Sequence, residues 1–402
     1  MTTLTSVRKP ADFRAEFPML ARVVHLATCS LGARSAALDA SLGRMLDAMS
    51  AGPGAWSEFE QQAQGARQRF AALIGAHPDQ VAIVPNASVG AYQIASTLML
   101  GCRDRVITTT EEFPSIAHVW LAQRPRGVQV VFADAAGASG ATGTADADPM
   151  DAGHYGAAVD AHTALVSVPL VTYRHGRLLP VTEVAALAHA RGARVFVDAY
   201  QALGVLPVDV DELGCDYLVA GTCKYLLGLP GVAFLYVRDG VAGGLDPALT
   251  GWFGRVDPFA FNPRRLDFPS TARRFETGMP AVPALYAANA GLDLIADLDL
   301  HEVRRHVTGL IELATQQLTA QGERVPKASA AAAHGAHIAL VDTDPHALAA
   351  RLAEHGIAVS PRGSVVRLSF HYYNDAHDVE LLCAALRQCR RLSRRAENRV
   401  YR

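Results

Sequence analysis

Cysteine is scarce in this sequence, and so is any imbalance of charge. Only six cysteines occur in 402 residues, and they have neither the paired C-x-x-C spacing of a zinc site nor the density of a disulfide-stapled domain. The formal net charge is −2, which argues against a protein that binds nucleic acid through a basic surface. We therefore expect reduced thiols, no metal site and no nucleic-acid partner.

Long apolar runs are also missing. No stretch reaches about 18 uncharged apolar residues, the length at which a segment becomes a candidate membrane span. The opening segment, MTTLTSVRKPADFRAEF, lacks the apolar core of a signal peptide. We expect a cytoplasmic protein without a membrane partner. Hydrophobic residues make up 50% of the chain and charged residues 19%, which is typical of a well-packed globular protein.

The fold class follows from an alternation of two patterns. Seven apolar, β-branched runs alternate with helical patterns; they begin near residues 80, 104, 128, 163, 193, 216 and 231. Such alternation predicts βαβ units and an α/β fold with a mainly parallel seven-stranded sheet, covered on both faces. The length exceeds what one core comfortably supports. We expect an N-terminal arm (1–20), a large domain (21–260) and a smaller α+β C-terminal domain (261–402).

The segment RGARVFVDAYQALG raises a chemical question, because a buried strand ends in a carboxylate. Asp198 ends the apolar run, Gln201 follows it closely, and Lys224 comes after the next strand, in AGTCKYLLGLPG. Ligands of open parallel sheets bind at the carboxyl ends of strands. A pyridoxal phosphate (PLP) site needs a lysine amine for a Schiff base and a carboxylate at the pyridine nitrogen. Lys224 and Asp198 supply both groups, and Gln201 can donate a hydrogen bond to the phenolic oxygen of the ring.

Other residues that follow predicted strands meet the remaining needs of such a site. Ala87 and Ser88 open a helix, whose free N–H groups and dipole favour a phosphate. Phe113, in EEFPS, can stack on the cofactor ring. Tyr173, in VTYRHG, faces the expected substrate pocket and can bind the phosphate or protonate a leaving group.

Each of these residues also has an ordinary structural explanation. An aspartate at a strand end, such as Asp198, is more often a helix cap, and a lysine in a glycine-rich turn, such as Lys224, ordinarily faces solvent. We expect Ser88 to be the N-cap of its helix in any case. Phe113 could simply pack in the hydrophobic core, and Tyr173 could simply end a strand. It is the conjunction of all five at strand ends that favours a cofactor site.

Taken together, the segments resemble the class V aminotransferase family, fold type I PLP enzymes that include kynureninases and cysteine desulfurases. The resemblance extends over nearly the whole chain and rests on HLATCSLG, PNASVG, EEFPS, VFVDAYQ, AGTCKYLLGLPG, GWFG, RRFETGMP and VVRLSFHYYN. It implies Lys224 as the Schiff-base lysine, Asp198 at the pyridine nitrogen, Gln201 at the phenolic oxygen and Phe113 over the ring. It also implies that Arg367 binds the α-carboxylate of the substrate, a role that suits a guanidinium.

The resemblance further implies a homodimer with shared active sites. In this family GWFG and ETGMP lie near the subunit interface, so we expect Trp252 and Gly278 to reach a neighbour's cofactor. Met279 stands where the desulfurase branch has a threonine that binds the neighbouring phosphate, so that hydrogen bond is lost or is supplied by Thr277.

Two further departures concern cysteine. Cys223 stands where many relatives have His or Tyr, and we expect Thr222 to bind the phosphate in its place. No cysteine occurs between Cys223 and Cys383, so the reactive thiol that desulfurases carry before the arginine is absent from this sequence. Desulfurase activity by that route is not expected.

The expected function is that of a PLP-dependent enzyme acting on an α-amino acid through aldimine and quinonoid intermediates. Aminotransferase is the first expectation, because transamination needs no further catalytic group. The alternative is a β-eliminating carbon–sulfur or carbon–carbon lyase, which the kynureninase-like SLG and GWFG segments favour. A non-enzymatic PLP-binding regulator would need a DNA-binding domain, and only about twenty residues precede the expected fold.

Overall fold

The structure is a computed structural model that describes residues 8–99, 101–133, 150–241, 244–326 and 333–400. Its helices and strands are, in chain order, α1 (Pro10–Arg14), β1 (Val24–His25), α2 (Ala36–Met49), α3 (Ala55–Leu73), β2 (Val81–Val84), α4 (Ala87–Ser96), β3 (Arg105–Thr108), α5 (Pro114–Leu121), β4 (Gln129–Phe132), α6 (Ala152–Ala158), β5 (Thr163–Pro169), α7 (Val181–Ala190), β6 (Arg194–Asp198), α8 (Val210–Leu213), β7 (Tyr217–Gly221), β8 (Ala233–Val237), α9 (Val282–Ala296), α10 (Leu300–Ala320), β9 (His337–Val341), α11 (Pro345–Glu354), β10 (Ile357–Ala358), β11 (Ser360–Arg362), β12 (Val365–Ser369) and α12 (Ala376–Val400).

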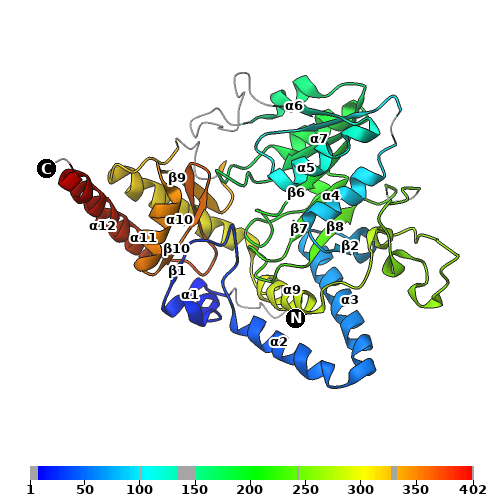
Figure 1. Ribbon diagram of the computed structural model, residues 1–402, viewed down its shortest axis with the longest axis horizontal. Coiled ribbons are helices and arrows are strands. Elements are labelled where there is room, and N and C mark those ends of the chain that lie inside the picture. Colours follow the sequence, from blue (N-terminus) through cyan, green and yellow to red (C-terminus); the bar gives the residue numbers. More distant parts are fainter. Residues whose placement is uncertain (1–7, 100, 134–149, 242–243, 327–332, 401–402) are drawn as a thin grey trace, which may run out of the picture.

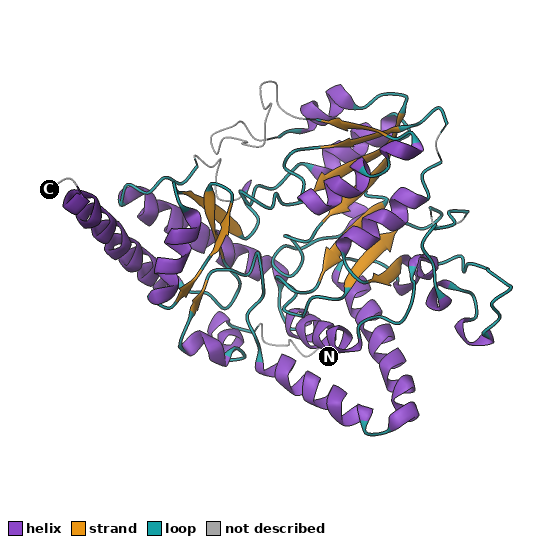
Figure 2. Ribbon diagram, in the orientation of Figure 1, coloured by secondary structure: helices purple, strands orange, loops and turns teal. Residues whose placement is uncertain are grey.

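A seven-stranded sheet forms the centre of the larger part of the molecule (Figures 1 and 2). Its strand order is β2-β8-β7-β6-β5-β3-β4. The strands from β4 to β7 pair in parallel, and β8 runs antiparallel to both of its neighbours. These are the seven strands that the apolar runs predict, so the mainly parallel seven-stranded α/β sheet is confirmed.

Helices cover both faces of this sheet, which explains why its central strands are almost wholly apolar. Every residue of β2, β7 and β8 is buried. One face packs against α4 and α5, where Ile94 and Trp120 belong to its hydrophobic cluster. The other face packs against α3, α7 and α9, with Phe70 and Val184 in a larger cluster. None of the helices that the structure describes combines the length and apolar character needed to cross a membrane.

The C-terminal part contains a second, antiparallel sheet of order β11-β12-β9, flanked by α10, α11 and α12 (Figure 1). The segment HIALVDT contains β9, and the segment SVVRLSFHYY contains β12. α9 is a single long helix that begins at Val282. It stops at Ala296, and the Asp299 side chain accepts hydrogen bonds from His301 N–H and Glu302 N–H to begin α10, because an aspartate satisfies the free donors of a helix start.

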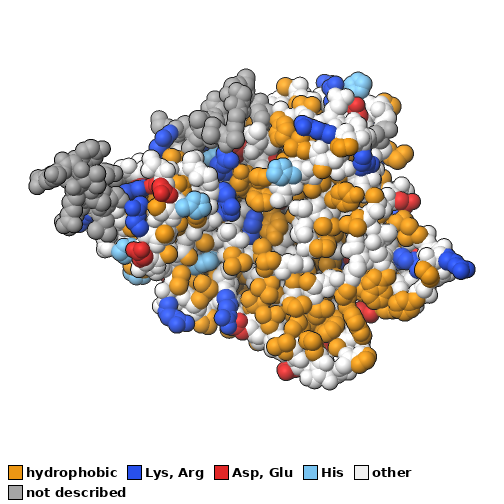
Figure 3. All heavy atoms as spheres, viewed as in Figure 1, with side chains coloured by type: hydrophobic (Ala, Val, Ile, Leu, Met, Phe, Trp, Pro, Cys, Tyr) orange, Lys and Arg blue, Asp and Glu red, His pale blue; other side chains and the backbone are white. Residues whose placement is uncertain are grey.

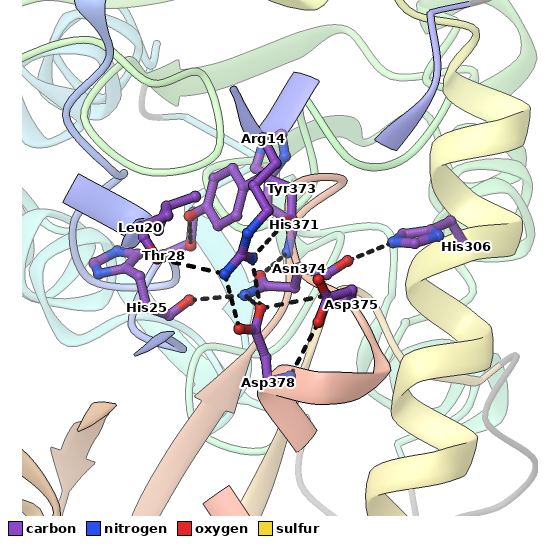
Figure 4. Close-up of polar contacts among 10 residues, drawn as sticks. All are labelled: Arg14, Leu20, His25, Thr28, His306, His371, Tyr373, Asn374, Asp375 and Asp378. Atoms are coloured by element: carbon purple, nitrogen blue, oxygen red, sulfur yellow. Dashed lines mark hydrogen bonds and ion pairs between the residues drawn. The ribbon is translucent and has the colours of Figure 1, made fainter. Parts of the chain in front are cut away.

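The N-terminal segment packs against this C-terminal part rather than standing apart from it. β1 pairs in parallel with β10. Arg14 of α1 forms an ion pair with Asp378 (2.9 Å) and donates a hydrogen bond to the carbonyl of Tyr373 (2.7 Å), as Figure 4 shows. Asn374 links the same carboxylate (2.8 Å) to the carbonyl of His25 (3.2 Å). These contacts place HLATCSLG and HYYN side by side.

Candidate active site

A pocket of about 240 Å³ lies at the carboxyl ends of β5, β6 and β7, beside the first residues of α4 and α5. Open α/β sheets bind their ligands at this position. Most of the predicted site residues line it, namely Ala87, Ser88, Phe113, Tyr173, Asp198, Gln201 and Lys224. The structure therefore brings together residues that follow five separate strands, β2, β3, β5, β6 and β7.

Lys224 enters the pocket from a tight turn after β7. Backbone hydrogen bonds close this turn, from Leu227 N–H to the Lys224 carbonyl (3.0 Å) and from Gly228 N–H to the Thr222 carbonyl (2.8 Å). Leu227 has a φ of 60°, a left-handed conformation that a leucine adopts only where packing imposes it. The turn is thus held in one shape, which fixes the point from which Lys224 projects.

Burial lowers the pKa of the Lys224 amine to about 8, although the negative charge of Asp198 opposes the shift. An uncharged amine is the form that attacks a carbonyl carbon. The Nζ atom lies 4.2 Å from the ring centroid of Tyr200 and 5.5 Å from that of Phe113. Within the described part of the chain Lys224 forms no ion pair, so its amine remains available to a ligand.

Asp198 ends β6 with 7% of its surface exposed. Its carboxylate accepts a hydrogen bond from Tyr200 N–H at 2.9 Å. Burial raises the pKa of Asp198, and the hydrogen bond and Lys224 only partly oppose this. A buried carboxylate is therefore held at a free-energy cost, which a positively charged partner would relieve.

Glu112 is a second buried carboxyl group near Asp198. Its two oxygens accept hydrogen bonds from Phe113 N–H (2.8 Å) and from the Ser167 hydroxyl (3.1 Å). Burial raises the pKa of Glu112 well above its usual range, and the negative charge of Asp198 raises it further. Two neighbouring carboxyl groups cannot both ionise at low cost. A negative charge on Asp198 therefore favours the protonated form of Glu112.

Gln201 is held between the pocket and the HLATCSLG segment. Its side-chain N–H donates a hydrogen bond to the Cys29 carbonyl at 3.0 Å. The buried Oε1 atom has no hydrogen-bond partner in the described part of the chain. A buried polar atom without a partner costs free energy. A ligand that donates a hydrogen bond to Oε1 would remove this cost.

Two aromatic rings form a wall of the pocket. Phe113 and Tyr173 meet edge to face, with centroids 5.3 Å apart and an interplanar angle of 87°. The Arg174 guanidinium donates a hydrogen bond to the Tyr173 hydroxyl at 3.1 Å. Phe113 can therefore present its face to a flat ligand while Tyr173 keeps a hydroxyl at the pocket.

The first turn of α4 forms another side of the pocket, and here one expectation is wrong. The N-cap is Asn86, whose side chain accepts a hydrogen bond from Val89 N–H at 3.0 Å, and not Ser88. Asn86 precedes the helix with extended backbone, as an N-cap must. Ser88 lies inside the first turn, where both its hydroxyl and its backbone N–H can face an anion.

Arg367 does not line this pocket but lies close to it. The side chain is 1% exposed, and it donates hydrogen bonds to the Tyr173 carbonyl (2.8 Å) and to the Ser360 hydroxyl (2.7 Å). Its Nε–H is buried without a partner in the described residues. The positive charge of Arg367 contributes to lowering the pKa of Lys224. A free donor on a fixed guanidinium is suited to an incoming carboxylate.

Three other predicted residues lie outside the pocket. The Thr222 hydroxyl donates to the Leu229 carbonyl at 2.7 Å, so the Lys224 turn already uses it. Trp252 stacks on Phe261 and meets Phe253 and Phe259 edge to face. Gly278 is exposed, and a Cβ atom there would meet no atom within 4 Å.

Two residues of the site were missed by the sequence reasoning. Tyr200 lines the pocket, and Glu112 lies behind Asp198. Both are adjacent in sequence to predicted residues, Tyr200 within VFVDAYQ and Glu112 within EEFPS. Neither spacing nor composition identifies Tyr200 or Glu112 as a site residue, because their roles depend on the direction in which each side chain points.

The residues present fit PLP. Lys224 supplies an amine of lowered pKa, and Asp198 supplies a buried negative charge that forms no ion pair with it. The second N–H of the Gln201 amide and the open first turn of α4 leave hydrogen-bond donors for the phenolic oxygen of the ring and for a phosphate. The aromatic wall supplies a stacking face.

Comparison with known proteins gives an independent view. The family model for aminotransferase class V matches residues 47–382. An uncharacterised aminotransferase from Bacillus subtilis is 35% identical over 92% of this chain and 95% of its own length. A kynureninase from Pseudomonas fluorescens is 27% identical over 86% of this chain and 84% of its own length.

Among solved structures, the apo cysteine desulfurase of Thermococcus onnurineus is similar in fold. Its TM-score is 0.85 at 22% sequence identity, and the match covers 96% of this chain and 99% of the desulfurase. At this identity the likeness concerns the fold only. It agrees with the fold type I architecture that the sheet order describes.

Proposed function

The chain belongs to the aminotransferase class V family with PLP as cofactor, and on that premise we propose that it is an aminotransferase for an α-amino acid. The observation that carries the proposal is the meeting of Lys224 and Asp198 in one pocket without an ion pair between them. An amine and a carboxylate so placed suit the two ends of a pyridine aldehyde.

In this proposal each ionisable residue of the pocket has a separate role. Lys224 would hold PLP through its amine, and the same amine, when free, can accept the proton of the substrate α-carbon and return it elsewhere. Asp198 would keep a proton on the ring nitrogen. When bound, PLP withdraws the electrons left on the α-carbon. Glu112, protonated, leaves the full negative charge to Asp198.

The remaining residues would bind and orient. Arg367 would take the substrate α-carboxylate through its free Nε–H, and its two existing hydrogen bonds keep the guanidinium in place. Gln201 would donate its second amide N–H to the phenolic oxygen, and Phe113 would cover one face of the ring. Holding the reacting groups in a fixed geometry is itself a large part of the rate enhancement.

A β-eliminating lyase is the second candidate, and Tyr173 is the observation that favours it. Its hydroxyl lies at the pocket, hydrogen-bonded to Arg174, where it can protonate a departing group on the substrate. The similarity to a kynureninase supports the same alternative. Transamination remains the first candidate because it requires no acid beyond Lys224.

One experiment separates the two reactions. The purified holoenzyme is incubated with a panel of α-amino acids and cysteine S-conjugates, without an amino acceptor, while the absorption spectrum is recorded. Conversion of the bound cofactor to its amine form, with one keto acid released per site, supports the aminotransferase. Continuous release of pyruvate and ammonia without that conversion would contradict it and support the lyase.

We also propose a homodimer that shares its active sites. Exposed hydrophobic side chains are frequent on α2 and α3, where Leu46, Met49 and Trp56 are 61%, 58% and 49% exposed. Figure 3 shows hydrophobic side chains gathered over the lower part of the molecule, where Figure 1 places these helices. Phe259 and Phe261, which contact Trp252, are 51% and 70% exposed. Apolar groups of this kind are typical of a subunit interface.

Sedimentation velocity tests the homodimer. The wild-type chain should sediment as a dimer, and Phe261→Asp should shift it toward the monomer with loss of turnover. A wild-type monomer that turns over substrate would contradict the proposal.

A further inference from the structure

The end of β7 offers little to a phosphate through its own side chains. Gly221 has no side chain, and Cys223 carries only a weakly polar thiol. The Thr222 hydroxyl between them is directed at the Leu229 carbonyl, 2.7 Å away, and is 3.4 Å from that of Val232. The segment that leads into Lys224 therefore lacks a strong, free hydrogen-bond donor in its side chains.

The hydroxyl of Tyr200 occupies the space that these residues leave. It lies 3.2 Å from the Cys223 sulfur. A Cβ atom built on Gly221 would come within 2.1 Å of the same hydroxyl, so no residue but glycine fits at 221 while Tyr200 has this position. A phenol from the neighbouring strand end thus takes the place of side chains at 221 and 223.

Three contacts fix Tyr200 in this place. Its N–H donates to the Asp198 carboxylate at 2.9 Å, its hydroxyl meets the Cys223 thiol, and its ring centroid lies 4.2 Å from Nζ of Lys224. The side chain lines the same pocket as Ala87 and Ser88 at the start of α4. An anion held at that helix start would have the phenol as a neighbour in the pocket wall.

We propose that the Tyr200 hydroxyl binds the phosphate group of PLP, replacing the polar side chain that Cys223 does not provide. This inference rests on the proposed function, because it assumes PLP in the pocket. The phosphate oxygens accept hydrogen bonds and the phenol donates one. Burial, with the nearby thiol and Asp198, raises the pKa of Tyr200 far above its usual value, so the phenol keeps its proton throughout the working pH range. A neutral donor bonded to a charged acceptor is among the stronger hydrogen bonds.

The test compares two ligands that differ only in the phosphate. PLP and pyridoxal, which lacks the phosphate, are titrated into cofactor-free wild type and Tyr200→Phe, and binding is followed by absorbance and protein fluorescence. The variant should bind PLP about 10- to 100-fold more weakly, the usual effect of losing a hydrogen bond to a charged group. Its affinity for pyridoxal should stay within about twofold of wild type.

The alternatives have distinct outcomes. An equal loss of affinity for PLP and pyridoxal would mean that Tyr200 acts only through packing. No loss of affinity for either ligand would mean that Tyr200 does not contact the phosphate. Each of these results overturns the inference and leaves the proposed function standing. Failure of the wild type to bind PLP at all would overturn both. Tyr92→Phe, on the exposed side of α4, is the matched control and should bind both ligands as wild type does.

A rescue variant addresses the local geometry directly. Tyr200→Ala empties the space over Gly221 and should lose PLP affinity. Adding Gly221→Ser to that variant places a hydroxyl in the same space, and should recover at least about tenfold in PLP affinity with no change for pyridoxal. Recovery for both ligands, or for neither, would contradict a donor role at this point.

Discussion

Lys224 and Asp198 lie in one pocket and influence each other's charge, yet they do not form an ion pair. Asp198 raises the pKa of the amine, and Lys224 lowers that of the carboxylate, but burial is the larger effect for both groups. An amine and an acid in direct contact would neutralise each other and leave neither for chemistry. Their separation within one pocket is what a ring bound between them requires.

The lowered pKa of Lys224 predicts how cofactor capture depends on pH. With a pKa of about 8, the uncharged fraction of the amine increases roughly tenfold from pH 7 to pH 9. The rate at which cofactor-free protein forms its Schiff base with PLP should rise by a similar factor and then level off. Stopped-flow absorbance measures this rate. A rate that continues to climb beyond pH 10 would indicate an ordinary, solvated lysine.

Replacement of Asp198 by asparagine should separate binding from catalysis. The variant keeps the shape of the side chain but removes the charge that holds a proton on the ring nitrogen. We expect kcat to fall by about 10²- to 10³-fold, as when one preorganised electrostatic group is lost, while the cofactor remains bound. Steady-state kinetics, with cofactor content measured on the same sample, provides the check. Unchanged kcat would remove Asp198 from the chemistry.

Arg367→Lys tests the carboxylate site. Lysine retains the charge but loses the fork of donors, so KM for an α-amino acid should increase by about 30- to 1000-fold. The corresponding amine without a carboxylate serves as control substrate and should react equally well with both proteins. If KM for the amino acid does not change, Arg367 does not bind substrate.

A buried ion pair outside the pocket predicts a stability effect. Arg67 and Glu276 are 6% and 4% exposed and lie 2.7 Å apart, and the same carboxylate oxygen accepts a hydrogen bond from Ile83 N–H at 3.0 Å. Arg67→Met would leave the buried Glu276 carboxylate with only the more distant Arg273, 4.0 Å away, as its ion-pair partner. The loss of the close partner should lower the free energy of unfolding by about 3 to 5 kcal/mol. Urea denaturation measures it.

The double variant Arg67→Met with Glu276→Leu is the control for that measurement. Since it removes both charges, it should recover much of the lost stability. A single variant as stable as wild type would mean that Glu276 is adequately solvated without its partner. The glutamate of the ETGMP segment is thus explained by the fold, whatever Gly278 does in an assembly.

The sheet could be predicted from the sequence because its strands are buried on both faces. Runs such as VFVD and YLVAG are short, apolar and bounded by polar or glycine-rich segments, which leaves few alternatives. The exact end of α9 is harder to predict, because the Asp299 cap of α10 follows the last residue of α9 by only three positions. A cap is decided by backbone conformation, which composition does not record.

The pocket could be predicted only in part, for a related reason. Asp198, Gln201 and Lys224 follow strands, and strand direction alone brings them to one edge. Tyr200 and Thr222 have equally suitable positions in sequence, yet one turns its hydroxyl to the pocket wall and the other to the Leu229 carbonyl. That choice depends on the space over Gly221 and on the turn after Lys224, both of which are properties of tertiary packing.

HYYN illustrates the opposite case, in which a motif belongs to the structure and not to the chemistry. His371 lies 3.0 Å, through Nε2, from the Tyr225 carbonyl, and burial lowers its pKa to about 4. A neutral imidazole that binds the residue after Lys224 ties the lysine turn to the C-terminal part. Its fixed contacts leave it no part in proton transfer.

The central claim is that Lys224 carries the cofactor. Holoenzyme is reduced with borohydride, digested and analysed by mass spectrometry, with Lys224→Ala treated in parallel. The account predicts a pyridoxyl group on the peptide that contains Lys224 and none on any peptide of the variant. A pyridoxyl group on a different lysine or on no peptide of the wild type would contradict it.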